Sequence, residues 1–214
     1  MCSSGPAACW ADGWGTRPDR LNGLKAWTTF CGVLAVASIA AWAGAPASAT
    51  LLQWDSALWL RQPWTLWTAS VVHLSTWHLL ANLLTLGALA VLGSSLGAGQ
   101  AATRALIVAW PLVTLTLLAW PAVRQYCGLS GLIHAAIAVL WAHAVVHRRA
   151  YPLSFVLFVG MGIKLLGEHA WLTPVSFDTS WGFNVVYASH LGGTLVGGVC
   201  GMVAAAWPLQ QESQ

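Results

Sequence analysis

Three short motifs in this chain combine a hydroxyl, imidazoles and an amide at spacings that helices use. They are His78 with Asn82, the run from Gly128 to Gly131 that contains Ser130, and His190 with Gly193 and Gly197. A serine hydroxyl becomes a useful nucleophile when a nearby base removes its proton, and the oxyanion formed by its attack needs hydrogen-bond donors. The three motifs supply these groups and therefore predict a serine hydrolase site.

Ser130 is the candidate nucleophile and His190 the candidate base. We expect Ser130 to begin a helix, where backbone N–H groups are free to donate hydrogen bonds. His78 and Asn82 are four residues apart and share one helix face, so both side chains can point at one oxygen. The predicted oxyanion donors are therefore His78, Asn82 and the backbone N–H of Ser130.

Glycines surround these residues where a close approach would be useful. Gly128 and Gly131 flank the candidate nucleophile and leave room for a substrate backbone. The run after the candidate base includes Gly193 and Gly197, whose small-xxx-small spacing lets two helix backbones come close. Such packing is expected to carry the base toward the hydroxyl.

No carboxylate is expected to join the reacting pair. Asp55, Asp178 and Glu168 are assigned to loops or to a helix end, and an unpaired acid inside a membrane would be costly. The sequence therefore predicts a Ser/His dyad rather than a triad. Lys164 and Glu168, four residues apart, have two interpretations: a self-neutralising pair near the interface, or a group that recognises the substrate.

His134 leaves the identity of the base open on geometry alone. It lies four residues after Ser130, so a helix would bring its imidazole near the hydroxyl, as His190 would from another helix. A lone histidine in a membrane protein is more often a packed core residue, and that interpretation is preferred for His73.

The composition places these motifs in a membrane, with lipid as the solvent. Of the 214 residues, 57% are hydrophobic and 7% are charged, an imbalance that a water-soluble domain of this size could not cover with polar surface. The net charge of +3 forms no basic stripe, so no nucleic-acid partner is expected. The five Cys contain no CxxC pair, and neither a metal site nor a cofactor is predicted.

Six apolar segments approach the length of about 20 residues that spans hydrocarbon, and inside lipid each must be a helix. They cover residues 26–47, 71–93, 105–120, 129–146, 153–166 and 188–207. The sequence thus predicts an all-α fold, a polytopic six-transmembrane-helix membrane domain over residues 26–207. A polar N-terminal tail is expected at 1–25 and a short C-terminal tail at 208–214.

The distribution of Lys and Arg predicts the orientation. With a cytoplasmic N-terminus, the inner ends hold most of the basic residues and the outer loops hold Arg61 and Arg124, so both termini are predicted to be cytoplasmic. The second, fourth and sixth segments then enter from the outer face, with His78, Ser130 and His190 within roughly 10 Å in depth. A signal-peptidase site at residues 47–49 is a competing interpretation, although the apolar stretch is long for one.

In this order, H-x-x-x-N, G-L-S-G and H-x-x-G-x-x-x-G resemble the motifs of the rhomboid family of intramembrane serine proteases. The resemblance covers all six segments. It implies a six-helix core with Ser130 as nucleophile, His190 as base, and His78, Asn82 and the Ser130 N–H as the oxyanion hole. Where many rhomboids have a Tyr that stacks on the catalytic imidazole, this chain has His134.

A narrower resemblance is to the rhombosortases. The chain shares with them Gly-Leu-Ser-Gly followed by His134, Pro63–Trp64 in the loop between the first two apolar segments, and the pair of Lys164 and Glu168. It implies a substrate protein with a C-terminal Gly-Gly motif, one transmembrane helix and a basic tail. Cleavage would take place at the periplasmic face of a bacterial inner membrane.

The leading interpretation is therefore a serine endopeptidase whose partners are membrane lipids and a transmembrane protein substrate. Two alternatives belong to other classes. A proteolytically inactive rhomboid-like binding protein would commonly lack the nucleophile or the base. A haem-binding or transport protein could use paired membrane histidines, but it would leave the Gly-Leu-Ser-Gly turn without a role.

Overall fold

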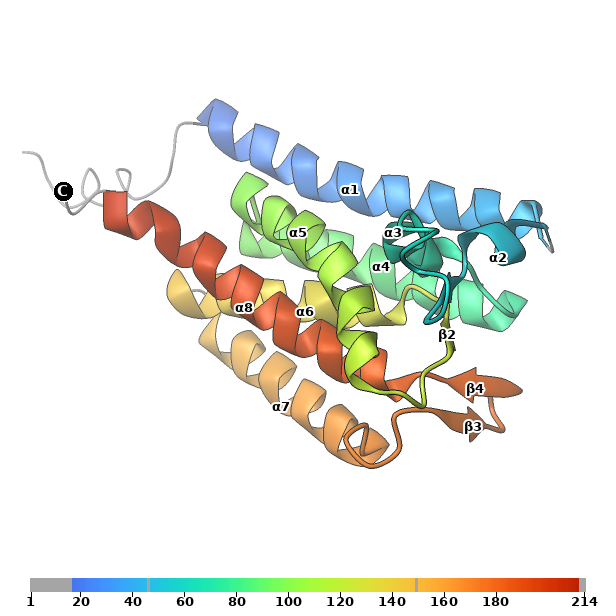
Figure 1. The fold of residues 1–214 in the computed structure, drawn as a ribbon. Helices are drawn as coiled ribbons and strands as arrows, with labels where there is room; N and C mark the ends of the chain where they lie inside the picture. Colours follow the sequence, from blue (N-terminus) through green and yellow to red (C-terminus); the bar gives the residue numbers. More distant parts are fainter. Residues whose placement is uncertain (1–16, 46, 149, 212–214) are drawn as a thin grey trace, which may run out of the picture.

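The computed structural model describes residues 17–45, 47–148 and 150–211. The chain is mostly helical (Figure 1). The helices are α1 (Arg17–Ala43), α2 (Ala47–Leu52), α3 (Thr65–Thr68), α4 (Thr76–Leu96), α5 (Gln100–Thr116), α6 (Ser130–Val146), α7 (Tyr151–Glu168) and α8 (Tyr187–Gln211), with 3-10 turns η1 (Ala69–Val71) and η2 (Leu117–Ala119). Each of the six predicted apolar segments coincides with one of the longer helices.

Four spans are long and apolar enough to cross a membrane, among the residues that the structure describes. They are Lys25–Ala43, Thr76–Leu96, Gln100–Ala119 and Tyr187–Ala206. Ser130–Val146 is a shorter apolar helix. It needs little lipid contact, because α6 packs against α4, α5, α7 and α8 and most of its side chains are buried.

Several helix boundaries differ from the sequence prediction. α4 begins at Thr76 instead of residue 71, because the hydroxyl of Ser75 accepts a hydrogen bond from the backbone N–H of His78 and caps the helix there. α1 begins at Arg17 and α8 continues to Gln211, so parts of both predicted tails are helical. A helix satisfies its own backbone hydrogen bonds and does not have to end with the apolar run. The tail predictions for 1–16 and 212–214 lie outside the described residues.

Two small sheets correct the all-α expectation. β1 (Trp54–Asp55) pairs antiparallel with β2 (Gln125–Tyr126), and β3 (Ser176–Asp178) forms a hairpin with β4 (Phe183–Val185). All four strands lie in the connections between helices. The first sheet joins the loop after α2 to the turn before α6, and the second lies just before α8 (Figure 1).

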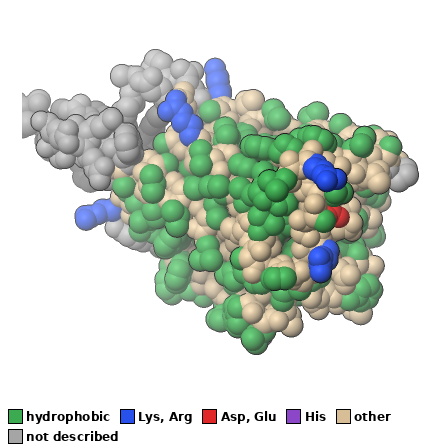
Figure 2. Space-filling view, in the orientation of Figure 1, with side chains coloured by type: hydrophobic (Ala, Val, Ile, Leu, Met, Phe, Trp, Pro, Cys, Tyr) green, Lys and Arg blue, Asp and Glu red, His purple; other side chains and the backbone are tan. Residues whose placement is uncertain are grey.

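The outer surface of the bundle is apolar, as the composition predicts for a protein in lipid. Figure 2 shows hydrophobic side chains spread over the visible face, with few charged side chains among them. Large hydrophobic side chains are exposed on several helices, for example Val36 on α1, Leu84 on α4, Phe155 on α7 and Val203 on α8. The polar groups that could do chemistry lie inside the bundle, near one end.

Candidate active site

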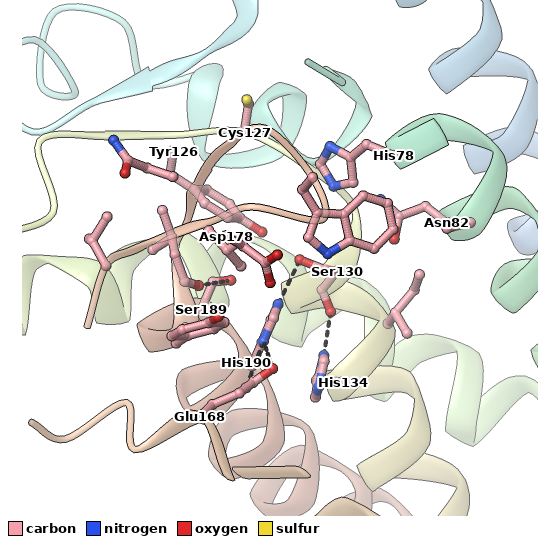
Figure 3. Close-up of a pocket in the computed structure, with 18 of the residues that line it drawn as sticks. His78, Asn82, Tyr126, Cys127, Ser130, His134, Glu168, Asp178, Ser189 and His190 are labelled. Atoms are coloured by element: carbon pink, nitrogen blue, oxygen red, sulfur yellow. Dashed lines mark hydrogen bonds and ion pairs between the residues drawn. The ribbon is translucent and has the colours of Figure 1, made fainter. Parts of the chain in front are cut away.

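The N-terminal ends of three helices bring the motif residues together. Ser130 is the first residue of α6, His190 is the fourth of α8, and His78 is the third of α4. The sequence placed His78 two turns into its segment, and the later start of α4 moves it to the first turn. Figure 3 shows these side chains around one cavity.

Close packing of α6 against α8 sets the separation of Ser130 and His190. A Cβ on Gly193 would meet the carbonyl oxygen of Gly131, and a Cβ on Gly197 would meet the backbone of Ala135. Only hydrogen atoms fit at these two positions of α8, because the neighbouring backbone occupies the space that a side chain needs. Without this approach the first turns of the two helices would stand further apart.

Ser130 and His190 are in hydrogen-bond contact. The distance from His190 Nε2 to Ser130 Oγ is 2.9 Å. The imidazole is buried, at 4% exposure, whereas Ser130 is partly exposed to the cavity. A hydroxyl at this distance from a ring nitrogen can pass its proton to that nitrogen when it attacks.

A carboxylate also reaches the imidazole, contrary to the sequence prediction. The two carboxylate oxygens of Glu168 lie 2.9 and 2.8 Å from His190 Nδ1, and one of them is 2.7 Å from Lys164 Nζ. Glu168 is indeed at a helix end, as predicted. The prediction was wrong about how deep in the bundle this helix end lies. α7 continues to Glu168 and ends there, with His169 in a left-handed conformation (φ 49°), and the Glu168 carboxylate lies beside the first turn of α8.

His134 contacts both Ser130 and His190 without touching the hydroxyl. Its Nδ1 is 2.7 Å from the carbonyl oxygen of Ser130, and its ring stacks on that of His190 with 4.2 Å between centroids and 11° between planes. Of the two histidines that the sequence left as candidate bases, His190 is therefore the one at Ser130 Oγ.

The turn before Ser130 is shaped by Gly128. Its φ of 116° is a conformation that side-chain-bearing residues rarely adopt, and a Cβ there would lie 2.8 Å from the His78 ring. The Gly128 N–H donates to the carbonyl of Ala69 at 3.0 Å, and the Tyr126 hydroxyl donates to the Gly128 carbonyl at 2.8 Å. These bonds hold the turn against His78.

The α4 residues that line the cavity carry unpaired polar atoms. Within the described part of the chain, Asn82 Nδ2 and His78 Nδ1 are buried without a hydrogen-bond partner. Both residues line the cavity beside Ser130. Because a buried polar group is normally paired, a donor such as the Asn82 amide is suited to a ligand oxygen that arrives later.

His73 packs against His78 and does not line the cavity. Its Nδ1 is 3.1 Å from the carbonyl of Val71, and its ring meets that of His78 edge-on at 5.0 Å. Burial lowers the pKa of His73 below its usual value, so the ring is neutral at physiological pH. This contact agrees with the interpretation of His73 as a core residue.

The cavity has a volume of about 1200 Å³, and of the polar side chains described in this subsection all but that of His73 belong to residues that line it. The β3–β4 hairpin covers its His78 side, where Phe183 lies 5.0 Å and Trp181 6.0 Å from the His78 ring. Cys127 is a second possible nucleophile in the lining. Burial raises the pKa of its thiol to about 12, so it stays protonated and unreactive near neutral pH.

The ring orientations do not favour a metal ion. His134, Glu168 and His190 bring three possible ligand atoms within 4.8 Å of one another. The two imidazoles are nearly parallel, so the lone pairs of their nitrogens run side by side, whereas the ligands of a tetrahedral site converge on one point. The cluster is better suited to hydrogen bonding around His190 than to coordination.

Comparison with known proteins agrees with this arrangement of motifs. A family model described as the Rhomboid domain matches residues 60–207, a range that contains α4 to α7, most of α8 and every residue of the cavity motifs. No curated protein matches the chain.

Proposed function

Because this chain belongs to the rhomboid family, a family of intramembrane serine proteases, we propose that it hydrolyses a peptide bond in a transmembrane protein substrate. The observation that carries the proposal is the 2.9 Å contact between Ser130 Oγ and His190 Nε2, at the wall of a cavity inside an apolar helical bundle. The alternative of an inactive binding protein would require neither the contact nor the cavity.

The reaction that this pair supports is acyl transfer through serine. His190 Nε2 takes the proton of Ser130 while Oγ attacks the substrate carbonyl, and the same nitrogen then protonates the departing amine. An ester between Ser130 and the substrate acyl group remains. Water attacks this ester with His190 again acting as base, and the free serine is restored.

The oxyanion is proposed to bind on the α4 side of the hydroxyl. Its donors are the backbone N–H of Ser130 and the side chains of Asn82 and His78. Support comes from the position of Ser130 at the start of α6, where a backbone N–H has no partner within the helix, and from the unpaired Asn82 amide. Donors fixed before the reaction stabilise charge as it develops.

For the membrane topology, we propose that six helices cross the membrane: α1, α4, α5, α6, α7 and α8. Both termini are then cytoplasmic, and the cavity lies toward the periplasmic side of a bacterial inner membrane. The placement of basic residues supports this orientation. The proposed substrate is of the rhombosortase type, a protein with a C-terminal Gly-Gly motif, a hydrophobic helix and a basic tail.

A serine-directed fluorophosphonate applied to the detergent-purified protein tests the mechanism. We expect covalent labelling of the wild-type protein and its loss in Ser130→Ala. A Thr85→Ala variant is the matched control, because that hydroxyl also lines the cavity but is bonded to its own helix, at 2.8 Å from the Ala81 carbonyl. Undiminished labelling of Ser130→Ala would reject the assignment, and absence of labelling together with substrate binding would favour the inactive binding protein.

The substrate class is tested separately with a reporter that ends in a Gly-Gly motif, a hydrophobic helix and a basic tail. We expect co-expression with the wild-type protein to release the reporter from the membrane and co-expression with Ser130→Ala to leave it anchored. If the fluorophosphonate labels the protein but the reporter is not cleaved, the protease proposal stands and the rhombosortase subtype is rejected.

A further inference from the structure

Glu168 is the one carboxylate in contact with His190 among the residues that the structure describes. Both of its oxygens lie within 2.9 Å of Nδ1, on the opposite side of the ring from the Ser130 hydroxyl. We propose that Glu168 is a positioning residue that makes the reacting group a Ser–His–Glu triad. This inference rests on the proposed function, because it concerns how His190 serves as the base.

The geometry decides which ring nitrogen carries the proton. A neutral imidazole has one N–H, and His190 accepts the proton of Ser130 only if that N–H is on Nδ1. An ionised carboxylate can only accept hydrogen bonds, so Glu168 selects the tautomer with the proton on Nδ1. Nε2 is then left with a lone pair aimed at the hydroxyl.

The same carboxylate stabilises the ring after the proton moves. When Ser130 attacks, Oγ loses its proton to Nε2 and His190 becomes a cation, while Glu168 keeps its charge and takes no proton. Two opposite charges at 2.8 Å, both on side chains that are largely buried, attract strongly, which stabilises the charge-separated intermediate. A dyad without a carboxylate would lack this contribution.

Lys164 holds the carboxylate in place. Its ammonium is 2.7 Å from one oxygen of Glu168, one helical turn away on α7. The carboxylate is 10% exposed and the Lys164 side chain 52%, so Lys164 extends from the interface and neutralises an acid that would otherwise be costly to bury. The two oxygens of Glu168 are thereby shared between one permanent cation and the catalytic ring.

One face of the His190 imidazole is also constrained. His134 stacks on it at 4.2 Å, so the ring is held between a flat partner on one face and directional hydrogen bonds at both nitrogens. A glutamate that served packing alone would not need to point both oxygens at Nδ1. The contact assigns Glu168 to the base, and the pair of Lys164 and Glu168 to the reaction instead of to substrate recognition.

Glu168→Gln tests the triad with little change in shape. The amide cannot provide the negative charge, and its NH2 group can donate to Nδ1 and leave the N–H on the wrong nitrogen. We expect kcat for reporter cleavage to fall about 10²–10⁴-fold with KM within about threefold, since the change acts on the base and not on substrate binding. Asp55→Asn is the matched control, because it removes an acid that caps a turn outside the cavity.

Glu168→Ala adds a readout that a structural role would not change. The space left beside Nδ1 can admit a small carboxylate. We therefore expect formate at high concentration to raise the cleavage rate of Glu168→Ala at least tenfold and to leave that of Ser130→Ala unchanged. Lys164→Met, a change at a half-exposed side chain, should lower kcat by a smaller factor of about 3–30. Thermal unfolding in detergent verifies that each variant is folded.

The outcomes separate the triad from the proposed function. Wild-type kcat in Glu168→Gln, or no effect of formate on a folded Glu168→Ala, would overturn the triad while leaving the serine protease intact. If Glu168→Gln does not fold, unchanged kcat in Lys164→Met together with no formate rescue overturns it equally. Failure of the fluorophosphonate to label wild-type protein would instead reject the protease function itself.

Discussion

The imidazole of His134 lies flat against that of His190, with 4.2 Å between ring centroids and 11° between planes. Its Nδ1 faces the Ser130 carbonyl at 2.7 Å, so the edge of the ring is engaged with the backbone of its own helix. His134 therefore offers His190 an aromatic face. A flat apolar ring could occupy the same place, whereas nothing could replace the nitrogen that faces Ser130 Oγ.

This relationship predicts opposite results for two substitutions. His134→Phe preserves a ring that can stack, so cleavage should stay within about tenfold of wild type, while His190→Ala removes the base and should lower kcat by at least about 10²-fold. Reporter cleavage and the rate of fluorophosphonate labelling both measure the effect. If His134→Phe abolishes cleavage in a folded protein and His190→Ala is tolerated, the base has been assigned to the wrong histidine.

The oxyanion donors give a second prediction. Asn82→Leu keeps the approximate volume of a buried residue but removes the unpaired amide nitrogen of a side chain that lines the cavity. We expect kcat to fall about 10²–10³-fold with little change in KM, because the donor acts on charge that exists in the transition state. The comparison is Thr85→Ala, one turn further along the same helix. Equal kinetics for the two variants would remove Asn82 from the oxyanion hole.

The proximity of Ser130 and His190 could be predicted from the sequence, because both lie near the start of apolar segments that the sequence predicts to enter the membrane from the same face. The position of Glu168 could not. Whether a residue at the end of α7 reaches the first turn of α8 depends on where α7 ends and how it is inclined, and no spacing in the sequence records either. The available signal was Lys164 and Glu168 themselves, two charges in an apolar helix, of which the acid needs a partner.

The structure of the segments that connect the helices was also predicted incompletely, for a different reason. β1 and β2 contain two residues each, which is too short for the alternation of polar and apolar residues that reveals a strand. The start of α4 was misplaced because residues 71–75 continue the apolar run, although Ser75 caps the helix after them. In both places particular hydrogen bonds determine the backbone, between distant residues for β1 and β2 and within one turn at Ser75, and hydropathy does not register them.

Gly128 provides a comparison between two kinds of constraint. Gly128 and Gly182 both have positive φ, at 116° and 76°, but a Cβ on Gly182 has nothing within 4 Å, whereas one on Gly128 lies 2.8 Å from the His78 ring. Gly182→Ala should therefore cost only backbone strain, of about 1–2 kcal/mol. Gly128→Ala should also displace His78 and lower kcat at least about tenfold in protein that remains folded. Similar kinetics for the two variants would show that the His78 ring has no role in catalysis.

Two adjacent glycines on α8 test whether helix packing sets the reacting distance. A Cβ on Gly197 would lie 2.5 Å from Ala135 Cα, while one on Gly198 has open space around it. Gly197→Ala should push α8 away from α6 and destabilise the protein by about 1–3 kcal/mol, with a matching loss of cleavage as His190 withdraws from Ser130. Gly198→Ala should leave both properties near wild type, since alanine is accommodated and favours the helix. Thermal unfolding in detergent and the rate of fluorophosphonate labelling measure the two effects, and equal behaviour of the two variants would mean that the α6–α8 contact does not position the base.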